Sequence, residues 1–235
     1  MLPRTGSAIL FASFIFALSC DDLPRDQSGT FDGIKRSGRM RVGLIENPPW
    51  VIRTGGEPAG AEVDMIRQFA SETGATPEWH WGGEEKSLGA LEKYELDLVI
   101  GGLSDQTPWY KRVGLTKQYF EEKIDIGVPT GQSLPDKLEG QQIAVSDARV
   151  AGFVREEGAV PVETEDLKSG RLVAAPEWQL AKLGLSPSRN ELHSDRHVVA
   201  VPPGENQLVK RLEEFLSKQR DQIPAILQQQ PEASK

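Results

Sequence analysis

The chain has little cysteine, histidine or aromatic content. Its 235 residues include one Cys and three His, and only 7% are aromatic. A single thiol excludes a disulfide framework and a cysteine-rich zinc module. His80, His193 and His197 lack the spacing of metal-ligand motifs. We therefore expect no metal and no cofactor, and stability that comes from a hydrophobic core.

Cations are also in the minority. There are 27 Lys and Arg against 35 Asp and Glu, which gives a formal net charge of -8. Nucleic-acid affinity comes mainly from clustered cations, so we expect no nucleic-acid partner. The 38% of hydrophobic and 26% of charged residues are typical of a globular protein. The length allows one large domain or two lobes, and we expect a monomer.

The longest apolar run lies at the N-terminus and is too short to span a membrane. It covers residues 8–18, follows Arg4, and ends beside small residues, as a secretory signal does. The tetrapeptide ending in Cys20, Ala-Leu-Ser-Cys, resembles a bacterial lipobox. That resemblance implies a lipoprotein signal peptide at 1–19 and a lipid attached to Cys20. The alternative is a plain signal peptide with an incidental Cys.

Two further features concern the localisation of the mature protein. Asp21 resembles the signal that keeps lipoproteins on the inner membrane of Gram-negative cells. Residues 20–33 are mostly polar and are predicted to form a tether. We expect a periplasmic or envelope protein that is lipid-anchored to the membrane.

The mature chain alternates strand patterns with helical patterns. Apolar runs at 40–44 and 96–100 predict strands, and helical stripes lie between them at 63–70 and 88–94. This order predicts an α/β fold with mostly parallel sheets. A stretch rich in Pro and Gly at 129–135 marks a boundary, after which a second set of strands and helices begins.

Several segments resemble the family 3 bacterial solute-binding proteins, the periplasmic receptors of polar amino-acid ABC importers. No single motif carries the resemblance, but the order and spacing of the segments do. They are GRMRVGLIENPPW at 38–50, residues 60–74 with Asp64, LDLVIGGLS at 96–104, QYF at 118–120 and LEGQQIAV at 138–145.

The resemblance implies a two-lobed periplasmic-binding-protein fold of the type II kind, with two mostly parallel sheets flanked by helices. Lobe 1 would comprise residues 34–124 plus 200–230, and lobe 2 residues 127–196. Strands at 123–128 and 197–201 would form the hinge, and 231–235 a frayed tail. A ligand that contacts both lobes then selects the closed state.

The resemblance also implies a ligand site at the strand ends of lobe 1. Glu46 and Trp50 follow the first strand, where an aromatic ring often covers the ligand; the alternative is a Trp buried in the lobe. After the buried strand, the glycines before Leu103 let backbone N–H groups approach an anion. The candidates there are Gly102, Leu103, Ser104 and Asp105.

One position departs from the family pattern. In amino-acid receptors an Arg shortly after this loop grips the α-carboxylate of the ligand with a bidentate fork. Here Trp109 stands at that place, and Arg112 lies one helical turn further on. Either Arg112 takes over the role or the ligand is not gripped as an α-amino acid, and both readings remain open.

In lobe 2, residues 146–149 open a helix where the family anchors a carboxylate. Asp147 is expected to cap this helix, and Arg149 to face the ligand. Glu177 and Trp178 fall near the place where the family has an acid that binds the amino group. Tryptophans beside acids would also suit a quaternary amine or polyamine as a second ligand class.

These residues predict a solute-binding lipoprotein that delivers a small polar solute, an amino acid or related amine, to an ABC permease. Nothing resembles a nucleophile elbow, a P-loop or a His-Glu-x-x-His motif, so we expect no enzyme. Two alternatives remain. One is a sensory lipoprotein not coupled to import. The other is a dehydratase-like enzyme in which Glu46 or Glu177 serves as general acid.

Overall fold

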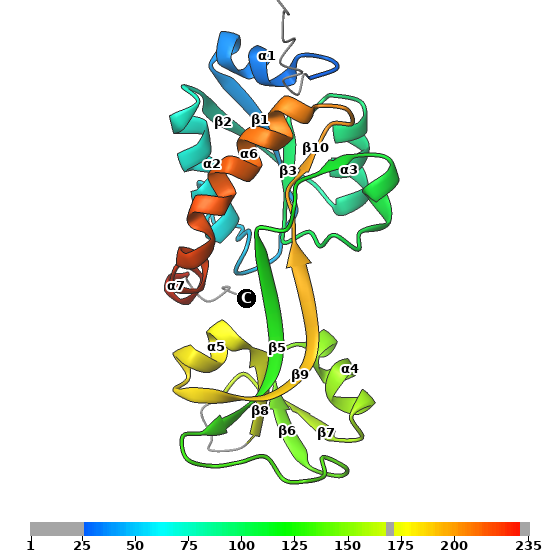
Figure 1. Ribbon diagram of the computed structural model, residues 1–235, viewed down its shortest axis with the longest axis vertical. Helices are drawn as coiled ribbons and strands as arrows, with labels where there is room; N and C mark the ends of the chain where they lie inside the picture. Colours follow the sequence, from blue (N-terminus) through cyan, green and yellow to red (C-terminus); the bar gives the residue numbers. More distant parts are fainter. Residues whose placement is uncertain (1–25, 168–171, 231–235) are drawn as a thin grey trace, which may run out of the picture.

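The molecule consists of two lobes joined by two long strands (Figure 1). The computed structural model describes residues 26–167 and 172–230. The expected signal peptide, Cys20 and the expected frayed tail at 231–235 lie outside the described residues. Within the described ranges, no helix is both long enough and apolar enough to cross a membrane.

Lobe 1 is built on a five-stranded sheet of order β2-β1-β3-β10-β4. Its strands are β1 (Arg39–Leu44), β2 (Thr76–Trp81), β3 (Leu98–Ile100), β4 (Gly114–Leu115) and β10 (Ala200–Val201). The helices of this lobe are α1 (Thr30–Ser37), α2 (Ala61–Glu72), α3 (Glu84–Glu92), α6 (Asn206–Gln219) and α7 (Ile223–Gln229), with short 3-10 turns η1 (Pro108–Lys111) and η2 (Arg220–Gln222).

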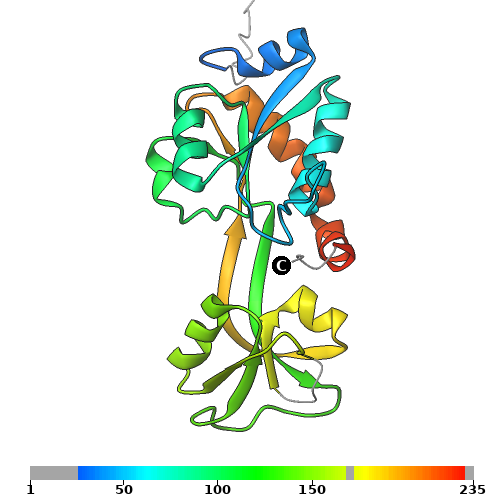
Figure 2. The ribbon, with the colours of Figure 1, turned by 180° about the vertical axis from the view of Figure 1, so that it is seen from behind.

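Lobe 2 is built on a second five-stranded sheet, of order β7-β6-β8-β5-β9. Its strands are β5 (Phe120–Pro129), β6 (Gln142–Val145), β7 (Val160–Glu163), β8 (Leu172–Pro176) and β9 (Leu185–His197). The helices α4 (Ala148–Glu156) and α5 (Glu177–Lys182) lie on the part of this lobe that faces lobe 1, as Figures 1 and 2 both show.

The buried strand β3 explains why lobe 1 has helices on both sides of its sheet. Leu98 and Ile100 join the hydrophobic cluster that contains α2 and α6, whereas Val99 joins the cluster on the α3 side. Successive side chains of a strand point to opposite faces, so an unbroken apolar run requires cover on both. The sequence prediction of a strand buried on both sides is confirmed.

The α/β two-sheet architecture agrees with the sequence prediction, but the sheets are mixed rather than mostly parallel. In lobe 1, β1 pairs in parallel with β2 and β3, while β10 is antiparallel to β3 and β4. In lobe 2, β6 is parallel to β7 and β8, while β5 is antiparallel to β8 and β9. The antiparallel pairings arise where the chain passes between lobes and enters a sheet from the other end.

The two linking strands are β5 and β9, paired antiparallel from Phe120 opposite His197 to Pro129 opposite Leu185. The sequence predicted the second link at 197–201, but β9 ends at His197 and β10 already belongs to lobe 1. Because β9 is an edge strand, its side chains are mostly exposed or half-buried, and it lacks the apolar run by which strands are recognised.

The segment expected to be a tether is fixed to lobe 1 from Asp26 onward. The carboxylate of the buried Glu205 accepts hydrogen bonds from the backbone N–H of Ser28 (2.7 Å) and of Thr30 (2.8 Å). Asp26 accepts from the N–H of Phe31 and of Leu208. Helix α1 therefore packs at the end of lobe 1 farthest from lobe 2 (Figure 1).

Candidate functional site

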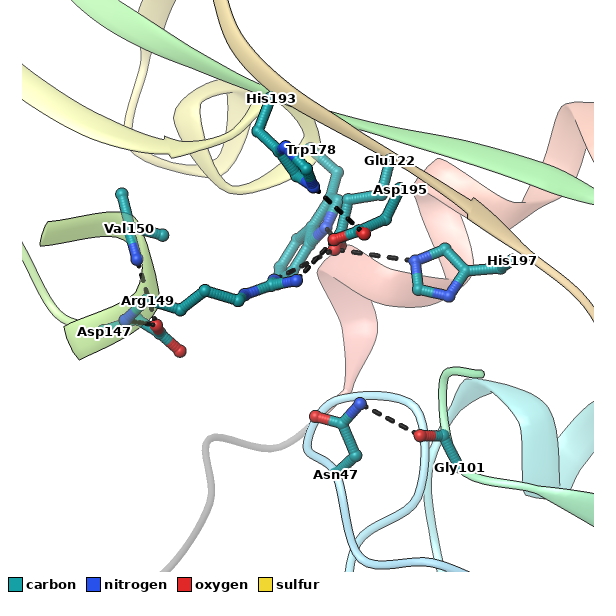
Figure 3. A network of polar contacts seen from close by, with 10 residues as sticks. All are labelled: Asn47, Gly101, Glu122, Asp147, Arg149, Val150, Trp178, His193, Asp195 and His197. Atoms are coloured by element: carbon teal, nitrogen blue, oxygen red, sulfur yellow. Dashed lines mark hydrogen bonds and ion pairs between the residues drawn. The ribbon is translucent and has the colours of Figure 1, made fainter. Parts of the chain in front are cut away.

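A cluster of charged and aromatic side chains lies between the lobes, beside the linking strands (Figure 3). We call it the hinge network; its members are Glu122, Arg149, Trp178, His193, Asp195 and His197. Glu122 and Asp195 stand directly opposite each other on β5 and β9. Because side chains alternate along a strand, His193 and His197 share a face of β9 with Asp195. Strand register thus brings these groups together.

Arg149 reaches this face from lobe 2. Asp147 caps α4 by accepting hydrogen bonds from the N–H of Arg149 (2.6 Å) and Val150 (3.2 Å), which is the capping role expected of it. One guanidinium nitrogen of Arg149 bonds to Asp195, and another lies 3.9 Å from Glu122 Oε2. The Arg149 side chain is 52% exposed, so a solute can reach it.

Trp178 connects lobe 2 to both the linking strands and lobe 1. Its indole Nε1–H donates to Glu122 Oε1 at 2.8 Å. Its ring packs against the main hydrophobic cluster of lobe 1, although α5 belongs to lobe 2. Trp178 therefore responds to any change in the angle between the lobes.

The two histidines of β9 differ in their surroundings. His193 stacks on Phe153 and places Nε2 3.2 Å from Asp195 Oδ1. His197 is 3% exposed, and neither ring nitrogen has a hydrogen-bond partner among the described residues. Its Nε2 lies 3.6 Å from Glu122 Oε2, and its ring centroid lies 4.1 Å from that of Trp50. His197 therefore lies between the Glu122 carboxylate and the Trp50 ring.

Trp50, expected as a cover for the ligand, is placed in the core of lobe 1. It is 2% exposed and packs against Tyr119, Phe120 and His197. The structure thus corresponds to the alternative that the sequence left open, a buried Trp. Glu46 points elsewhere, pairing with Arg53 at 3.1 Å on the surface.

The loop after β3 binds a carboxylate, but one that belongs to the protein itself. Glu62, at the start of α2, accepts hydrogen bonds from the N–H of Gly101 (2.7 Å) and Gly102 (2.8 Å), and from the Tyr119 hydroxyl (2.6 Å). Burial raises the pKa of Glu62, and burial together with Glu62 raises the pKa of Tyr119 well above its usual value. These two amides are therefore occupied rather than free for a ligand.

The conformation of this loop requires glycine. Gly102 has φ 65°, and a Cβ on it would lie 2.5 Å from Asn47 Nδ2, whose amide donates to Gly101 O. Beyond it, Leu103 is buried in the cluster on the α3 side, and Ser104 forms a backbone bridge with His197. Asp105 pairs with Arg196 at 2.8 Å.

Trp109 and Arg112 lie away from the hinge network, against α3. Arg112 bonds to Glu92 through Nε at 3.1 Å, and its guanidinium sits 4.2 Å from the Trp109 ring centroid. Trp109 packs against the cluster that contains Leu88 and Val113. Because Glu92 and the ring hold Arg112, the structure does not bring it to the network as the sequence allowed.

Glu177 lies in the first turn of α5, next to Trp178, but is exposed and makes no contact with Glu122 or Arg149 among the interactions described. Its pKa is raised by partial burial and by Asp125. Across residues 26–167 and 172–230 there is no group of three or more His, Cys, Asp or Glu side chains that could hold a metal ion.

Of the residues predicted from the sequence, the structure brings Arg149 and Trp178 into the hinge network; the other members, Glu122, His193, Asp195 and His197, were not among the predictions. Glu62 was not among them either. Only the pairing of β5 with β9 shows that Glu122 and Asp195 are neighbours. A period-2 pattern at 193, 195 and 197 was the available signal for a shared face.

Comparisons with known proteins agree with this architecture. The sequence profile of the bacterial extracellular solute-binding proteins, family 3, matches residues 40–229. Two curated relatives are both named membrane-bound lytic murein transglycosylase F. The one from Vibrio parahaemolyticus is 28% identical over 135 residues, 57% of this chain and 25% of the relative. The one from Vibrio campbellii is 25% identical over 201 residues, 79% of this chain and 36% of the relative. The chain thus spans well under half the length of these relatives.

Solved structures share the fold. An ancestral cationic amino acid solute binding protein, AncCDT-1, has a TM-score of 0.67 at 16% identity and covers 83% of this chain and 98% of its own. YCKB from Bacillus subtilis has a TM-score of 0.64 at 18% identity, covering 81% and 88%. A mutant of ArgBP from T. maritima has a TM-score of 0.52 at 22% identity, covering 84% and 96%.

Proposed function

Because this chain belongs to the bacterial extracellular solute-binding proteins, family 3, we propose that it captures an amino acid or a related amine between its two lobes. The observation that supports this most is the hinge network. Arg149 and Trp178 come from lobe 2, Glu122 and Asp195 come from the linking strands, and Trp178 also packs on lobe 1. A solute bound there would contact lobe 2 and the linking strands, and would lie beside the Trp178 ring that packs on lobe 1.

The chemistry of the network suits a small polar ligand. It offers one arginine fork and two carboxylates within one cluster, which are groups that bind carboxylates and ammonium groups respectively. Two structural neighbours are named as a cationic amino acid solute binding protein and as ArgBP. We take these as support for an amino acid or amine as the solute class.

We further propose that the protein is a non-enzymatic, monomeric receptor that delivers its solute to an ABC permease. A lipid on Cys20 would hold it at the membrane in the periplasm or cell envelope. The fixed position of residues 26–37 on lobe 1 would then leave about five residues between the lipid and the fold. At about 3.5 Å per residue these reach at most about 20 Å, which keeps lobe 1 near the membrane.

A thermal-shift screen tests the ligand-binding proposal. Amino acids, amines and polyamines are added singly to the purified protein, and a ligand that binds the folded state raises the Tm by mass action. Small-angle scattering should then report a smaller radius of gyration with the same ligand. A Tm and a scattering profile that no member of the library changes would contradict the proposal.

A sensory or regulatory role is the second candidate. One observation keeps it open: this chain matches 25% and 36% of the length of two relatives that are named for murein transglycosylase activity and not for transport. Uptake assays separate the two candidates: deletion of the gene should abolish import of the bound solute if the protein serves a permease, and should leave import unchanged if it signals. Conversion of the solute during incubation, followed by NMR, would instead indicate the dehydratase alternative.

A further inference from the structure

We propose that a cavity in lobe 1 binds the phosphate group of a membrane phospholipid and so holds this end of the protein against the membrane. The cavity has a volume of about 500 Å³ and is lined by residues of α1, β1 and β2 and of the segments before α1 and β3. It lies near the start of the parallel strands, whereas the loops that reach the hinge network follow their carboxyl ends. The membrane as the source of the phosphate rests on the proposed lipid at Cys20, but the site does not depend on the solute proposed between the lobes.

The first argument is the charge of the cavity. Its lining contains three arginines and two acids, which are Arg36, Arg39, Arg41, Glu78 and Asp97. The lining therefore carries one positive charge in excess, although the whole chain has a formal net charge of -8. An anionic group is thus attracted to this cavity even though the protein as a whole repels it.

The second argument is that these arginines keep N–H groups for a ligand. Arg36 is exposed and makes no hydrogen bond or ion pair with another residue of the described chain. Arg39 bonds to Glu78 through Nε, which leaves the two terminal nitrogens of its guanidinium group, and its side chain is 67% exposed. Arg41 is held by Asp97 through Nε at 3.2 Å. Guanidinium groups match the oxygens of a phosphate with paired N–H donors, so this set suits a phosphate.

The third argument is the space that α1 leaves open. Thr30, Gly33 and Ser37 are three or four residues apart on one face of this helix, and all three line the cavity. A Cβ on Gly33 would have no other atom within 4 Å. Glycine in the middle of a helix costs stability relative to almost any other residue, so helix formation does not explain Gly33. Its lack of a side chain instead keeps this wall of the cavity low enough for a headgroup to enter.

The location of the cavity favours a membrane as the source of the phosphate. Helix α1 lies at the end of lobe 1 farthest from lobe 2 (Figures 1 and 2). Ser28, which lines the cavity, is eight positions after Cys20, and a chain of that length reaches at most about 28 Å. A lipid on Cys20 would therefore hold the cavity within reach of the headgroups of the membrane that carries it.

Hydrogen exchange on an anchored chain tests the proposal. The chain without the expected signal peptide, residues 20–235, contains both described lobes with their hydrophobic cores. Cys20 is its only cysteine, so a maleimide lipid attaches at that residue alone. The anchored chain is placed on vesicles of equal parts phosphatidylcholine and phosphatidylglycerol, and on vesicles of digalactosyl diacylglycerol, which contains no phosphate. Exchange at the amides of residues 30–41 is then compared between the two.

We expect these amides to exchange more slowly on the phospholipid vesicles, because a bound headgroup covers α1 and the start of β1. Arg36→Gln should reduce this protection by about fivefold, the effect of one cation near an anionic surface. Gly33→Glu should reduce it at least as much, since it cancels the excess positive charge, and Gly33→Gln should reduce it less because it adds similar volume without charge. Arg155→Gln is the control, since Arg155 is an exposed arginine of lobe 2 and should not affect the protection.

Equal exchange on the two kinds of vesicle overturns the inference, as does an Arg36→Gln variant that behaves like Arg155→Gln. Inorganic phosphate is also added to the unattached chain at the concentration of the lipid phosphate. The same protection there would assign the cavity to a free phosphate and overturn the membrane as its source. Protection in the unattached chain that is lost in Asp21→Asn/Asp22→Asn would assign the cavity to the acids of the N-terminal segment, and this also overturns the inference.

The thermal-shift screen is run on the same variants to separate this inference from the proposed function. A chain that binds a solute but shows no protection on phospholipid loses the inference alone. A chain that shows the protection but binds no solute loses the proposed solute class and keeps the inference.

Discussion

At the scale of single residues, Glu62 determines what the loop after β3 can do. The residue is 1% exposed, and its carboxylate accepts hydrogen bonds from two backbone amides and the Tyr119 hydroxyl. A buried carboxyl group is more easily kept neutral, which is why burial raises its pKa despite these donors. The backbone amides that the sequence suggests for binding an anion are therefore already bonded to the carboxylate of Glu62.

The raised pKa predicts how Glu62 contributes to stability as pH changes. Between the pKa of the unfolded chain and the higher pKa of the folded chain, the folded state binds more protons, so this contribution falls as pH rises through that window. Glu62→Gln removes the titration, keeps an oxygen for the amides of Gly101 and Gly102, and lets its NH2 group donate to Tyr119. We expect the free energy of unfolding of the wild type to fall relative to that of Glu62→Gln as pH rises.

Urea unfolding at several pH values from about 4 to 8 measures this difference, and Glu72→Gln is the matched control because Glu72 is exposed on the same helix. The control should follow the wild type at every pH. A difference between Glu62→Gln and the wild type that does not vary with pH would contradict the assignment of a raised pKa to Glu62.

The sequence could predict the chemical type of this loop but not its partner. Glycines after a buried strand indicate backbone N–H groups that face an oxygen anion, and the structure has that arrangement. The anion is Glu62, which lies 39 residues earlier in the chain. Its proximity follows from the packing of α2 on the sheet, and no local pattern encodes that packing.

At the scale of elements, α1 depends on a residue outside the helix. The residue before α1 is Gly29, which has no side chain to cap the helix, and Asp26 accepts only from the N–H of Phe31 in its first turn. Glu205, just before α6, supplies both carboxylate oxygens to Ser28 and Thr30 instead. The buried Glu205 thus helps Asp26 to fix α1 to lobe 1.

We expect Glu205→Ala to lower the free energy of unfolding by about 1–3 kcal/mol, because it leaves two partly buried N–H groups without their acceptor. Hydrogen exchange at the amides of Ser28 and Thr30 should become faster than at the amides of β1. Glu214→Ala is the control, since Glu214 lies on α6 and makes an exposed pair with Arg211. Unchanged exchange at Ser28 and Thr30 in Glu205→Ala would show that α1 does not depend on this carboxylate.

Strands differed in how well the sequence predicted them. The run at 40–44 matches β1 except for its first residue, and the run at 96–100 contains β3, because apolar residues packed in a lobe core leave a readable pattern. β9 left none, since an edge strand that spans the space between lobes needs few apolar side chains. The candidate site draws its six residues from β5, α4, α5 and β9, and β9, the strand that was hardest to predict, carries half of them.

At the scale of the whole molecule, few groups connect the two lobes. β5 and β9 connect them covalently, and Trp178 adds a contact by packing on lobe 1 while it bonds to Glu122. The overall fold could be predicted because segment order and spacing resemble the family. The meeting of Glu122 with Asp195, 73 residues apart, depends on strand register and could not.

Trp178 should therefore report closure. The other four tryptophans lie in lobe 1: Trp50 in its core, Trp79 and Trp81 on β2, and Trp109 on η1. Rotation of lobe 2 changes the surroundings of Trp178 and leaves those within lobe 1 largely as they are. We expect the change in tryptophan emission on adding a bound solute to be lost in Trp178→Phe and retained in Trp79→Phe.

Small-angle scattering on the same variants shows whether Trp178 only reports the closure of the lobes or also contributes to it. The radius of gyration should fall on ligand addition in Trp178→Phe as in the wild type, because β5 and β9 remain intact and the phenyl ring still packs on lobe 1. If Trp178→Phe keeps the full emission change, the moving boundary lies elsewhere than at α5. If it loses both the emission change and the decrease in radius, the indole N–H to Glu122 contributes to closure itself, since that hydrogen bond is the polar contact that the substitution removes.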